Sequence, residues 1–275
     1  MSTTVEDNFI PTGFQVIDKQ QGGLSRGRVY AVGAPSGGGK SVLANQISIN
    51  AYKAGFSVLY GSLEMNREEC LMRTQSNITR IPHDRFQLKT VGQDEKIRSD
   101  KTLVQFLQSG AKSGKPLEYL CPTYDITLAQ FFTQAAIKKF DLVVVDYINL
   151  FAPLDPKKEL WWNIGEGFRL AKIFAKRMNC AVIMLVQIDE ETGNLKYAKS
   201  IKHHSDGVWV WMKDEKNEES GIVEVEQVKL RNFKPNKFVL KPEFEFCSFT
   251  ESFGAGALST VGQELDLGAL KPMSL

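Results

Sequence analysis

A glycine-rich loop at residues 33–41 constrains the fold of this chain more than any other feature. It reads Gly-Ala-Pro-Ser-Gly-Gly-Gly-Lys-Ser, follows an apolar run that ends at Val32, and leads directly into a segment with helical periodicity. This order of strand, loop and helix is typical of the P-loop, in which backbone N–H groups and the helix N-terminus hold the phosphates of a nucleoside triphosphate. Only Ala34 departs from the usual pattern, which has glycine there. We therefore expect a nucleotide site rather than a chance glycine-rich turn.

The loop also predicts roles for its side chains. Lys40 is expected to reach the β- and γ-phosphates, and the Ser41 hydroxyl to bind Mg²⁺. Such a site needs an acidic residue at the tip of a neighbouring buried strand, and Asp146 closes the apolar run 142–146. An Asp after a strand usually starts a turn, but the loop upstream favours Asp146 as a second magnesium ligand. The expected cofactors are ATP or another NTP, with Mg²⁺, and the predicted nucleotide-binding residues are Ala34, Pro35, Ser36, Gly37, Gly38, Gly39, Lys40, Ser41 and Val42.

Apolar runs of strand length recur along the chain and predict an α/β fold. They cover residues 28–32, 57–62, 117–120, 142–146 and 181–187, and their continuous apolar character is typical of parallel strands covered by helices on both faces. Helical segments are predicted at residues 41–54, 94–113, 127–140 and 165–178. A further helix is predicted through residue 72, opened by a capping box of Asn66 and Glu69.

The pattern changes after Gln187 to alternating strands with short turns. These strands are predicted at residues 207–212, 221–230, 237–240 and 244–249, as an antiparallel extension of the parallel sheet. Residues 251–275 are rich in Gly, Ser, Ala and Leu without periodicity, which indicates a flexible tail. We therefore predict a short N-terminal segment at 1–9, one domain at 10–250 and a tail at 251–275.

Charge and cysteine content help to predict the cellular compartment, but they do not identify the ligand. The 34 basic and 32 acidic residues nearly balance, so any grip on a polyanion must come from local basic loops. The four cysteines show no spacing typical of a zinc site or a disulfide framework. Residues 1–8 are polar and acidic, and no stretch is long and apolar enough to cross a bilayer, so we expect a cytoplasmic protein without a membrane partner.

Several separate motifs, in matching order, resemble the ATPase domain of DnaB-type replicative helicases. They are residues 10–14 with Gly22, Gly23 and Leu24, the run 62–65, the strand end 146–150, and residues 229–232. The resemblance spans about residues 10–249 and implies a RecA-like P-loop fold that forms a ring, with a hexamer expected. It covers the motor domain without the N-terminal domain of such helicases, as in a minimal phage-like motor or a fragment. It also implies the cytoplasm of a bacterium or of a phage-infected host.

The resemblance assigns four further catalytic residues besides Lys40. Glu64 matches the carboxylate that polarises the attacking water, and Gln187 matches the polar sensor of the γ-phosphate. Lys229 and Arg231 match two cations that reach the ATP of the neighbouring subunit. In the sequence, the buried face of their strand switches near Gln227, which predicts a β-bulge that re-aims the pair.

Two loops match the positions where such rings hold single-stranded DNA. The first carries Lys157 and Lys158, and the second, residues 189–205, carries Lys196, Lys199 and Lys202. Loop lysines can follow phosphates without sequence preference, although charge runs are often only solvated faces. The second loop reads Lys-Tyr-Ala-Lys-Ser at 196–200 where the family has a glycine-bearing stretch, so the family's DNA contacts do not transfer there. We expect Trp209 and Trp211 to be core residues.

Three functions agree with these patterns. The first is an ATP-driven ring helicase that translocates on single-stranded DNA and unwinds duplex. The second is a recombination or DNA-packaging ATPase of the RecA type, and the third is an ATP-loaded adaptor that does not unwind. For the first, the tail at 251–275 is a candidate contact for a primase, polymerase or loader.

Overall fold

The computed structural model describes residues 8–188, 198–212 and 221–252, and its centre is one sheet. Six strands of this sheet run parallel to one another. They are β3 (Val29–Ala34), β4 (Val58–Ser62), β5 (Leu117–Leu120), β6 (Leu142–Asp146), β7 (Ala181–Gln187) and β8 (Gly207–Val210). The first five lie within or close to the predicted runs, which confirms the parallel core.

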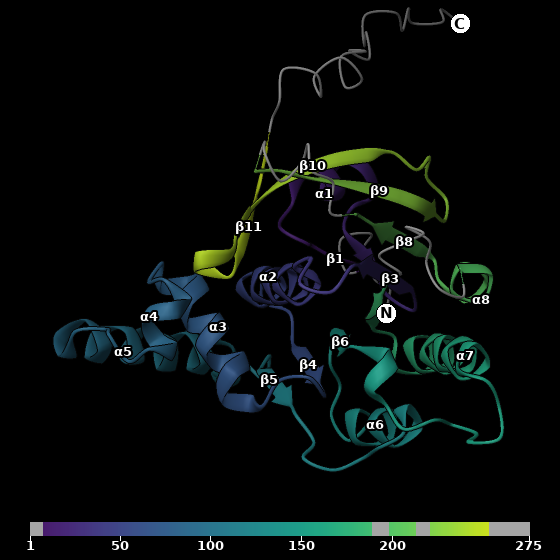
Figure 1. Cartoon of the computed structure of the whole chain (residues 1–275), viewed down its shortest axis with the longest axis horizontal. Coiled ribbons are helices and arrows are strands. Elements are labelled where there is room, and N and C mark those ends of the chain that lie inside the picture. The colour runs from purple at the N-terminus through teal and green to yellow at the C-terminus, as the bar shows by residue number, and fades with distance from the viewer. Residues whose placement is uncertain (1–7, 189–197, 213–220, 253–275) are drawn as a thin grey trace, which may run out of the picture.

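Three antiparallel strands extend the sheet beyond β8 (Figure 1). They are β9 (Val223–Leu230), β10 (Lys237–Glu243) and β11 (Ser248–Glu251), and the full order is β11-β10-β9-β8-β3-β7-β6-β4-β5. The antiparallel extension is therefore confirmed, with one correction: β8 pairs with β3 in parallel. A long connection with its own helix separates β7 from β8, which is what a parallel crossover requires.

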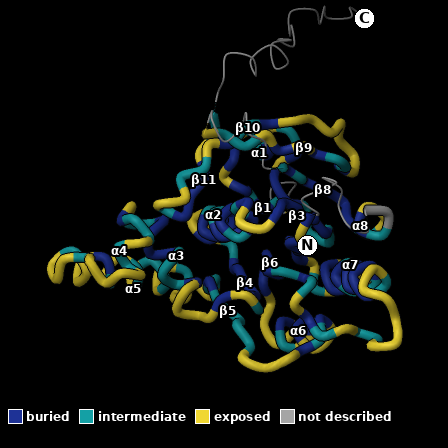
Figure 2. Tube along the Cα trace, viewed as in Figure 1, coloured by how far each residue is buried: buried dark blue, intermediate teal, exposed yellow. Residues whose placement is uncertain are grey.

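Helices cover both faces of the sheet (Figures 1 and 2). One face packs against α1 (Gln15–Gln21), α2 (Lys40–Lys53), α3 (Arg67–Thr79) and α5 (Gln93–Lys112), and the other against α6 (Leu128–Ala135), α7 (Leu160–Met178) and α8 (Ala198–His204). Alternate residues of one strand point to opposite faces of the sheet. Val144 therefore belongs to the hydrophobic core on one face, and Val143 to the core on the other. This burial on both faces explains the continuous apolar runs. The remaining elements are β1 (Phe9–Ile10), β2 (Leu24–Ser25), α4 (His83–Gln87), η2 (Ile148–Leu150) and η3 (Phe244–Phe246).

Four predicted element boundaries are wrong for identifiable reasons. Helix α6 ends at Ala135 rather than at residue 140, because the chain turns at Ile137, which is 81% exposed, to bring β6 into the sheet. Helix α7 begins before Gly165, which is not a start signal but a packing site: a Cβ there would lie 2.9 Å from the Ser200 side chain. Helix α3 continues past residue 72, and the predicted strand 244–249 begins only at Ser248, after η3.

Three finer predictions are confirmed. The Asn66–Glu69 capping box opens α3, with Glu69 N–H donating to Asn66 Oδ1 at 2.9 Å. The β8–β9 register shifts between Lys229 and Gln227, so β9 carries the expected bulge. Trp209 and Trp211 are buried, as expected of core residues. None of the described helices is long and apolar enough to cross a membrane.

A buried carboxylate ties together the ends of three segments on the side of the sheet where β6 begins. Asp141 accepts hydrogen bonds from Ser57 N–H at 2.7 Å and from Arg26 Nη2 at 2.7 Å, and it pairs with Lys115 Nζ at 2.9 Å. Burial alone would raise the pKa of this carboxyl group. The hydrogen bonds from Lys115, Ser57 and Arg26 outweigh burial and hold the pKa of Asp141 at about 2.

Asp141→Asn is therefore expected to lower the free energy of unfolding by about 2 kcal/mol at neutral pH. Because the folded pKa lies below the unfolded value of 3.8, this contribution is present above about pH 4 and is lost as the pH falls through about 2. Chemical denaturation of both proteins from pH 7 down to the acid limit of folding checks this. A stability difference that stayed constant over that range would exclude the carboxylate charge as its source.

Candidate nucleotide site

The loop between β3 and α2 is a P-loop in geometry as well as in sequence. Gly37 and Gly39 adopt positive φ angles of 64° and 88°, which glycine adopts without strain. Gly38 N–H donates to Pro35 O at 3.1 Å, and the buried indole of Trp211 donates to Gly38 O at 2.8 Å. The loop is thus pre-shaped by its own turn and by the core beneath it.

Lys40 begins α2 and lies almost buried, with 9% of its surface exposed. Its ammonium donates to Pro35 O at 3.0 Å and lies 5.9 Å from the centre of the Tyr147 ring. These contacts hold the charge within the loop, on the side where phosphates bind in a P-loop.

The predicted magnesium ligands are in contact with each other. Ser41 Oγ donates to Asp146 Oδ1 at 3.1 Å, and Tyr60 Oη donates to Asp146 Oδ2 at 2.6 Å. Asp146 is fully buried, and burial raises its pKa although the hydrogen bonds from Tyr60 and Ser41 lower it. A hydroxyl and a carboxylate are hard oxygen donors, so this pair fits Mg²⁺ by its chemistry.

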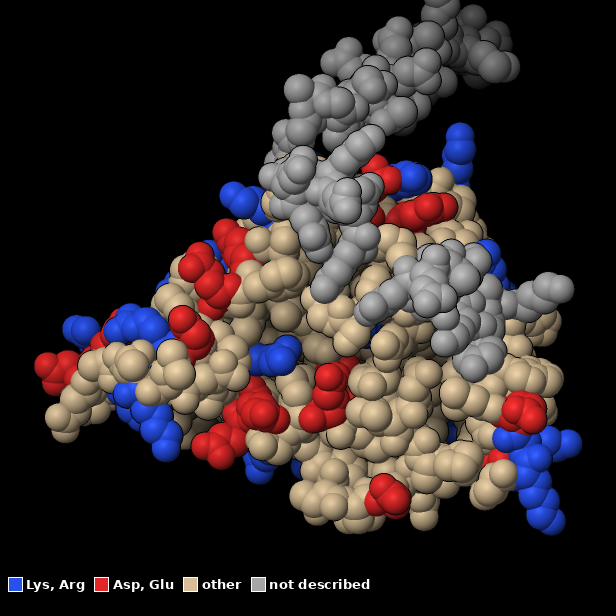
Figure 3. All heavy atoms as spheres, viewed as in Figure 1, with Lys and Arg blue, Asp and Glu red and all other residues tan. Residues whose placement is uncertain are grey.

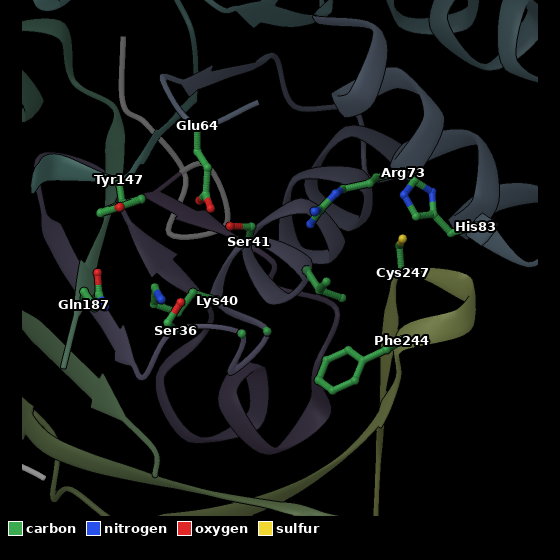
Figure 4. Close-up of a pocket in the computed structure, with 13 residues that line it drawn as sticks. Ser36, Lys40, Ser41, Glu64, Arg73, His83, Tyr147, Gln187, Phe244 and Cys247 are labelled. Carbon is green, nitrogen blue, oxygen red and sulfur yellow. The ribbon is translucent and has the colours of Figure 1, made fainter. Parts of the chain in front are cut away.

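Glu64 and Gln187 border the same cavity from neighbouring strand ends. Glu64 lies just after β4, in a loop fixed by a hydrogen bond of 3.0 Å from Leu63 N–H to Asp146 O. Gln187 is the last residue of β7. It pairs in register with Ala34, which is the last residue of β3. In Figure 4 the Glu64 carboxylate points toward Ser41, and Gln187 lies beside Lys40 and Ser36. The structure therefore brings together Lys40, Ser41, Asp146, Glu64 and Gln187.

The cavity holds about 300 Å³ and opens on the face shown in Figure 3, where acidic and basic side chains both rim a central hollow. Five lining residues are not among the predicted site residues: Arg73, His83, Tyr147, Phe244 and Cys247. Arg73 stands on α3 and points into the cavity in Figure 4. One Arg on a polar helix looks like any surface residue in sequence, so only the fold reveals its place.

Lys229 and Arg231 are not part of this cavity. Leu230 pairs with Gly207 at the start of β8, so both cations lie where β3 begins, whereas the P-loop lies where β3 ends. Lys229 Nζ donates to Lys202 O, and Arg231 Nε forms an ion pair of 2.9 Å with Asp206. Arg231 follows β9 in a turn rather than lying on the strand, and β9 is flanked by β8 and β10 rather than forming a solvated edge.

Asp206 anchors this second cluster of cations. Its side chain is 3% exposed and accepts from Arg28 Nη1 at 2.9 Å and from Val29 N–H at 3.0 Å, and it pairs with Lys172. Burial would raise its pKa, but these donors lower it, so Asp206 stays ionised at neutral pH. Arg231 is attached to this fixed anion while its side chain remains 48% exposed.

Four of the five predicted DNA-binding lysines lie around α7. Lys157 and Lys158 are exposed in the loop before α7, which Asn163 orders by donating to Asp155 O at 3.0 Å and to Lys158 O at 3.1 Å. Lys199 and Lys202 belong to α8, which packs along α7, so this stretch is helical rather than a loop. The reason is the buried Ile201, which seats the helix on the core. Lys196 lies outside the described residues.

Comparison with known proteins adds evidence of a different kind. A family model described as the DnaB-like helicase C terminal domain matches residues 9–249. The chain is 27% identical over 244 residues to the replicative DNA helicase DnaB of Pasteurella multocida, covering 81% of this chain and 51% of that protein. It is 26% identical over 258 residues to DnaB of Haemophilus influenzae, covering 87% and 54%. The chain thus spans about half the length of the curated relatives it matches.

Solved structures agree on the fold. The ATPase domain of a phage helicase superposes with a TM-score of 0.78 at 18% identity, covering 90% of this chain and 93% of that one. A DnaB-like replicative helicase, described with its interactions with primase, gives 0.76 at 17% identity over 88% of this chain and 61% of that one. A KaiC-like protein of Pyrococcus horikoshii gives 0.60 at 17% identity, covering 89% and 98%. The RecA-like fold is therefore confirmed, and it is shared beyond helicases.

Proposed function

This chain belongs to the family of DnaB-like helicase C-terminal domains, and from that premise we propose that it is the ATP-hydrolysing motor of a ring-forming replicative DNA helicase. The observation that carries the proposal is the cavity in which a P-loop, the Ser41–Asp146 pair and Glu64 meet. A nucleotide-binding adaptor would need the loop but not a carboxylate at the reacting end.

The proposed mechanism assigns one task to each group. Lys40 and the loop N–H groups bind the β- and γ-phosphates, and Ser41 and Asp146 would hold Mg²⁺, which would neutralise phosphate charge. Glu64, exposed at the mouth of the cavity, orients and polarises the attacking water. Gln187 contacts the γ-phosphate from the end of β7. Arg73, which points into the cavity, adds a second positive charge near the phosphates.

The last group of the proposed mechanism, Arg231, comes from the neighbouring subunit. Arg231 lies on the side of the sheet away from its own P-loop and is half exposed, so it is available to another chain rather than to its own nucleotide. The ion pair with Asp206 is formed by Nε, and about half of the Arg231 side chain, 48%, stays exposed. A planar pair of donors suits two phosphate oxygens, as arginine fingers require.

The substrate polymer is proposed to be single-stranded DNA, with the lysines near α7 along its phosphates. The relative described with primase makes a primase a reasonable partner to test, and the segment 253–275, proposed as its contact, lies outside the described residues. ATP hydrolysis stimulated by single-stranded DNA, together with unwinding of a forked duplex, tests the proposal. Stimulation without unwinding would instead favour a recombination or packaging ATPase.

DNA affinity is expected to fall steeply with salt and to depend little on base sequence, because lysines on phosphates release counterions. Replacing Lys157 and Lys158 by Ala, or Lys196, Lys199 and Lys202 by Ala, should reduce the slope of log affinity against log salt by about 0.7 per lost contact. Fluorescence anisotropy with two unrelated oligonucleotides at several salt concentrations measures this slope. Lys101 and Lys112, exposed on α5 across the molecule, provide the matched control pair. Equal slopes in all variants would move the DNA path elsewhere.

A further inference from the structure

Two thiols that the proposed mechanism does not use lie side by side where α3 meets the end of β5 (Figure 1). Cys70 Sγ donates to Cys121 Sγ, and the two sulfurs are 3.9 Å apart. Both cysteines are free. The sulfurs of a disulfide lie about 2.05 Å apart, so a further approach of about 2 Å would join this pair.

The two sulfurs differ in access to solvent and in reactivity. Cys70 is only 2% exposed, whereas Cys121 is half-buried and is followed by the exposed residues 123–125. The hydrogen bond from Cys70 lowers the pKa of Cys121, although burial raises it. A backbone hydrogen bond from Ser62 and the charge of Arg67 lower it further. The same hydrogen bond, followed by burial, raises the pKa of Cys70. Because the thiolate is the nucleophile, Cys121 is the sulfur that meets an oxidant first.

The two cysteines lie at opposite ends of the segment that carries Glu64. Gly61 pairs in register with Leu120, so the end of β4 at Ser62 lies beside Cys121. From there the chain passes through Glu64 into α3, of which Cys70 is the fourth residue. A bond between the two sulfurs would therefore tie the start of α3 to the strand ends from which Glu64 reaches the cavity.

Resting on the proposed function, we propose that Cys70 and Cys121 form a reversible disulfide on exposure to hydrogen peroxide, and that this bond slows ATP hydrolysis. The Cys121 thiolate attacks one peroxide oxygen, the O–O bond breaks, and Cys121 becomes a sulfenic acid. The hydroxide that leaves takes up the proton that Cys121 had released. The Cys70 sulfur then attacks the Cys121 sulfur, the S–S bond forms, the S–O bond breaks, and the second hydroxide takes the Cys70 proton. Two electrons thus pass from the sulfurs to the peroxide, which leaves as two waters, and a dithiol reductant reverses the bond by exchange.

The bond acts on the catalytic step rather than on nucleotide binding. Closing it draws α3 toward the end of β5 and shifts the segment that positions Glu64. A misplacement of about 1 Å at a reacting group can lower a rate by about 10²-fold. The P-loop lies between β3 and α2, outside the segment that the bond ties, so the affinity for Mg·ATP is retained.

The test compares the wild type with Cys121→Ser, Cys70→Ala and Cys180→Ala, each treated with hydrogen peroxide and then with dithiothreitol. Peptide mass mapping detects the disulfide, and ATP turnover and Mg·ATP affinity are measured on the same samples. The wild type should form the bond and lose about 10²-fold in kcat, with affinity unchanged and turnover recovered on reduction. Cys121→Ser and Cys70→Ala should keep the turnover of the reduced wild type. Cys180 is fully buried in the core on the other face of the sheet, so Cys180→Ala is the matched control and should respond as the wild type does.

The other outcomes overturn the proposal at different steps. If the oxidised wild type contains no bond between Cys70 and Cys121, the two thiols are not a redox pair. A bond that leaves kcat unchanged would exclude the effect on catalysis while the proposed function stands. Equal inhibition of Cys121→Ser would place the sensitive thiol elsewhere, with Cys247 in the nucleotide cavity as the first to map. If the reduced wild type does not hydrolyse ATP, the proposed function fails and the effect on turnover fails with it, whereas mass mapping still decides whether the bond forms.

Discussion

Lys40→Ala is expected to abolish ATP hydrolysis while leaving the fold intact. The ammonium is almost buried in the loop, where it donates to Pro35 O at 3.0 Å. Its charge offsets the phosphate charge that develops as the γ-phosphoryl group leaves. Removal of a single donor of this kind lowers the rate of other enzymes by about 10²–10³. The loss of nucleotide affinity adds to this effect.

Steady-state ATP turnover at saturating Mg²⁺, with and without single-stranded DNA, measures this loss. Lys53→Ala, at the exposed end of the same helix α2, is the matched control, because it removes the same side chain far from the loop. Both variants should unfold at the temperature of the wild type. Wild-type turnover in Lys40→Ala would show that the cavity is not the catalytic site.

Local patterns predict the P-loop and Asp146, whereas the resemblance to DnaB-type helicases assigns Glu64 and Gln187 to the catalytic half of the cavity. The P-loop is defined by glycines at fixed spacing, and Asp146 and Gln187 end apolar runs of strand length that form the buried strands β6 and β7. In a parallel sheet the carboxyl ends of the strands meet at one edge, so these positions converge once the strands are identified. Glu64, which the resemblance assigns, lies two residues past the end of β4 and so reaches the same edge of the sheet.

The other half of the cavity depends on contacts between distant segments, which no local pattern encodes. Phe244 follows Lys40 by about two hundred residues and reaches the P-loop only because η3 interrupts the predicted strand 244–249. The predicted start of α7 at Gly165 is wrong for the same reason. Gly165 packs against Ser200, which lies on another helix. The role of Asp206 as an anchor likewise follows from four segments that meet only in the fold.

Arg231→Ala is expected to lower ATP turnover by about 10³–10⁵, as loss of an arginine finger does, although Arg231 lies away from its own P-loop. Arg231→Lys should be nearly as inactive, because a point charge lacks the planar fork that spans two phosphate oxygens. Glu64→Gln should also be nearly inactive, but it should still bind ATP, because it keeps the size of the side chain and loses only its charge. The defect of Arg231→Ala and the defect of Glu64→Gln lie on opposite sides of the proposed interface between subunits.

Mixing the two inactive proteins therefore decides where Arg231 acts. In a ring the interface is head to tail, so an Arg231→Ala subunit offers an intact Glu64 site, and a Glu64→Gln neighbour offers an intact Arg231. About one quarter of the interfaces in an equal random mixture combine both intact groups, so part of the turnover should return. Mixing Arg231→Ala with Lys40→Ala should restore activity in the same way, because Lys40 and Glu64 belong to one cavity. Glu64→Gln with Lys40→Ala should restore nothing, since each of these subunits has a defective cavity of its own. If mixed assemblies form and Arg231→Ala is rescued by neither partner, Arg231 does not act across the interface, and its ion pair with Asp206 serves only the fold of its own subunit.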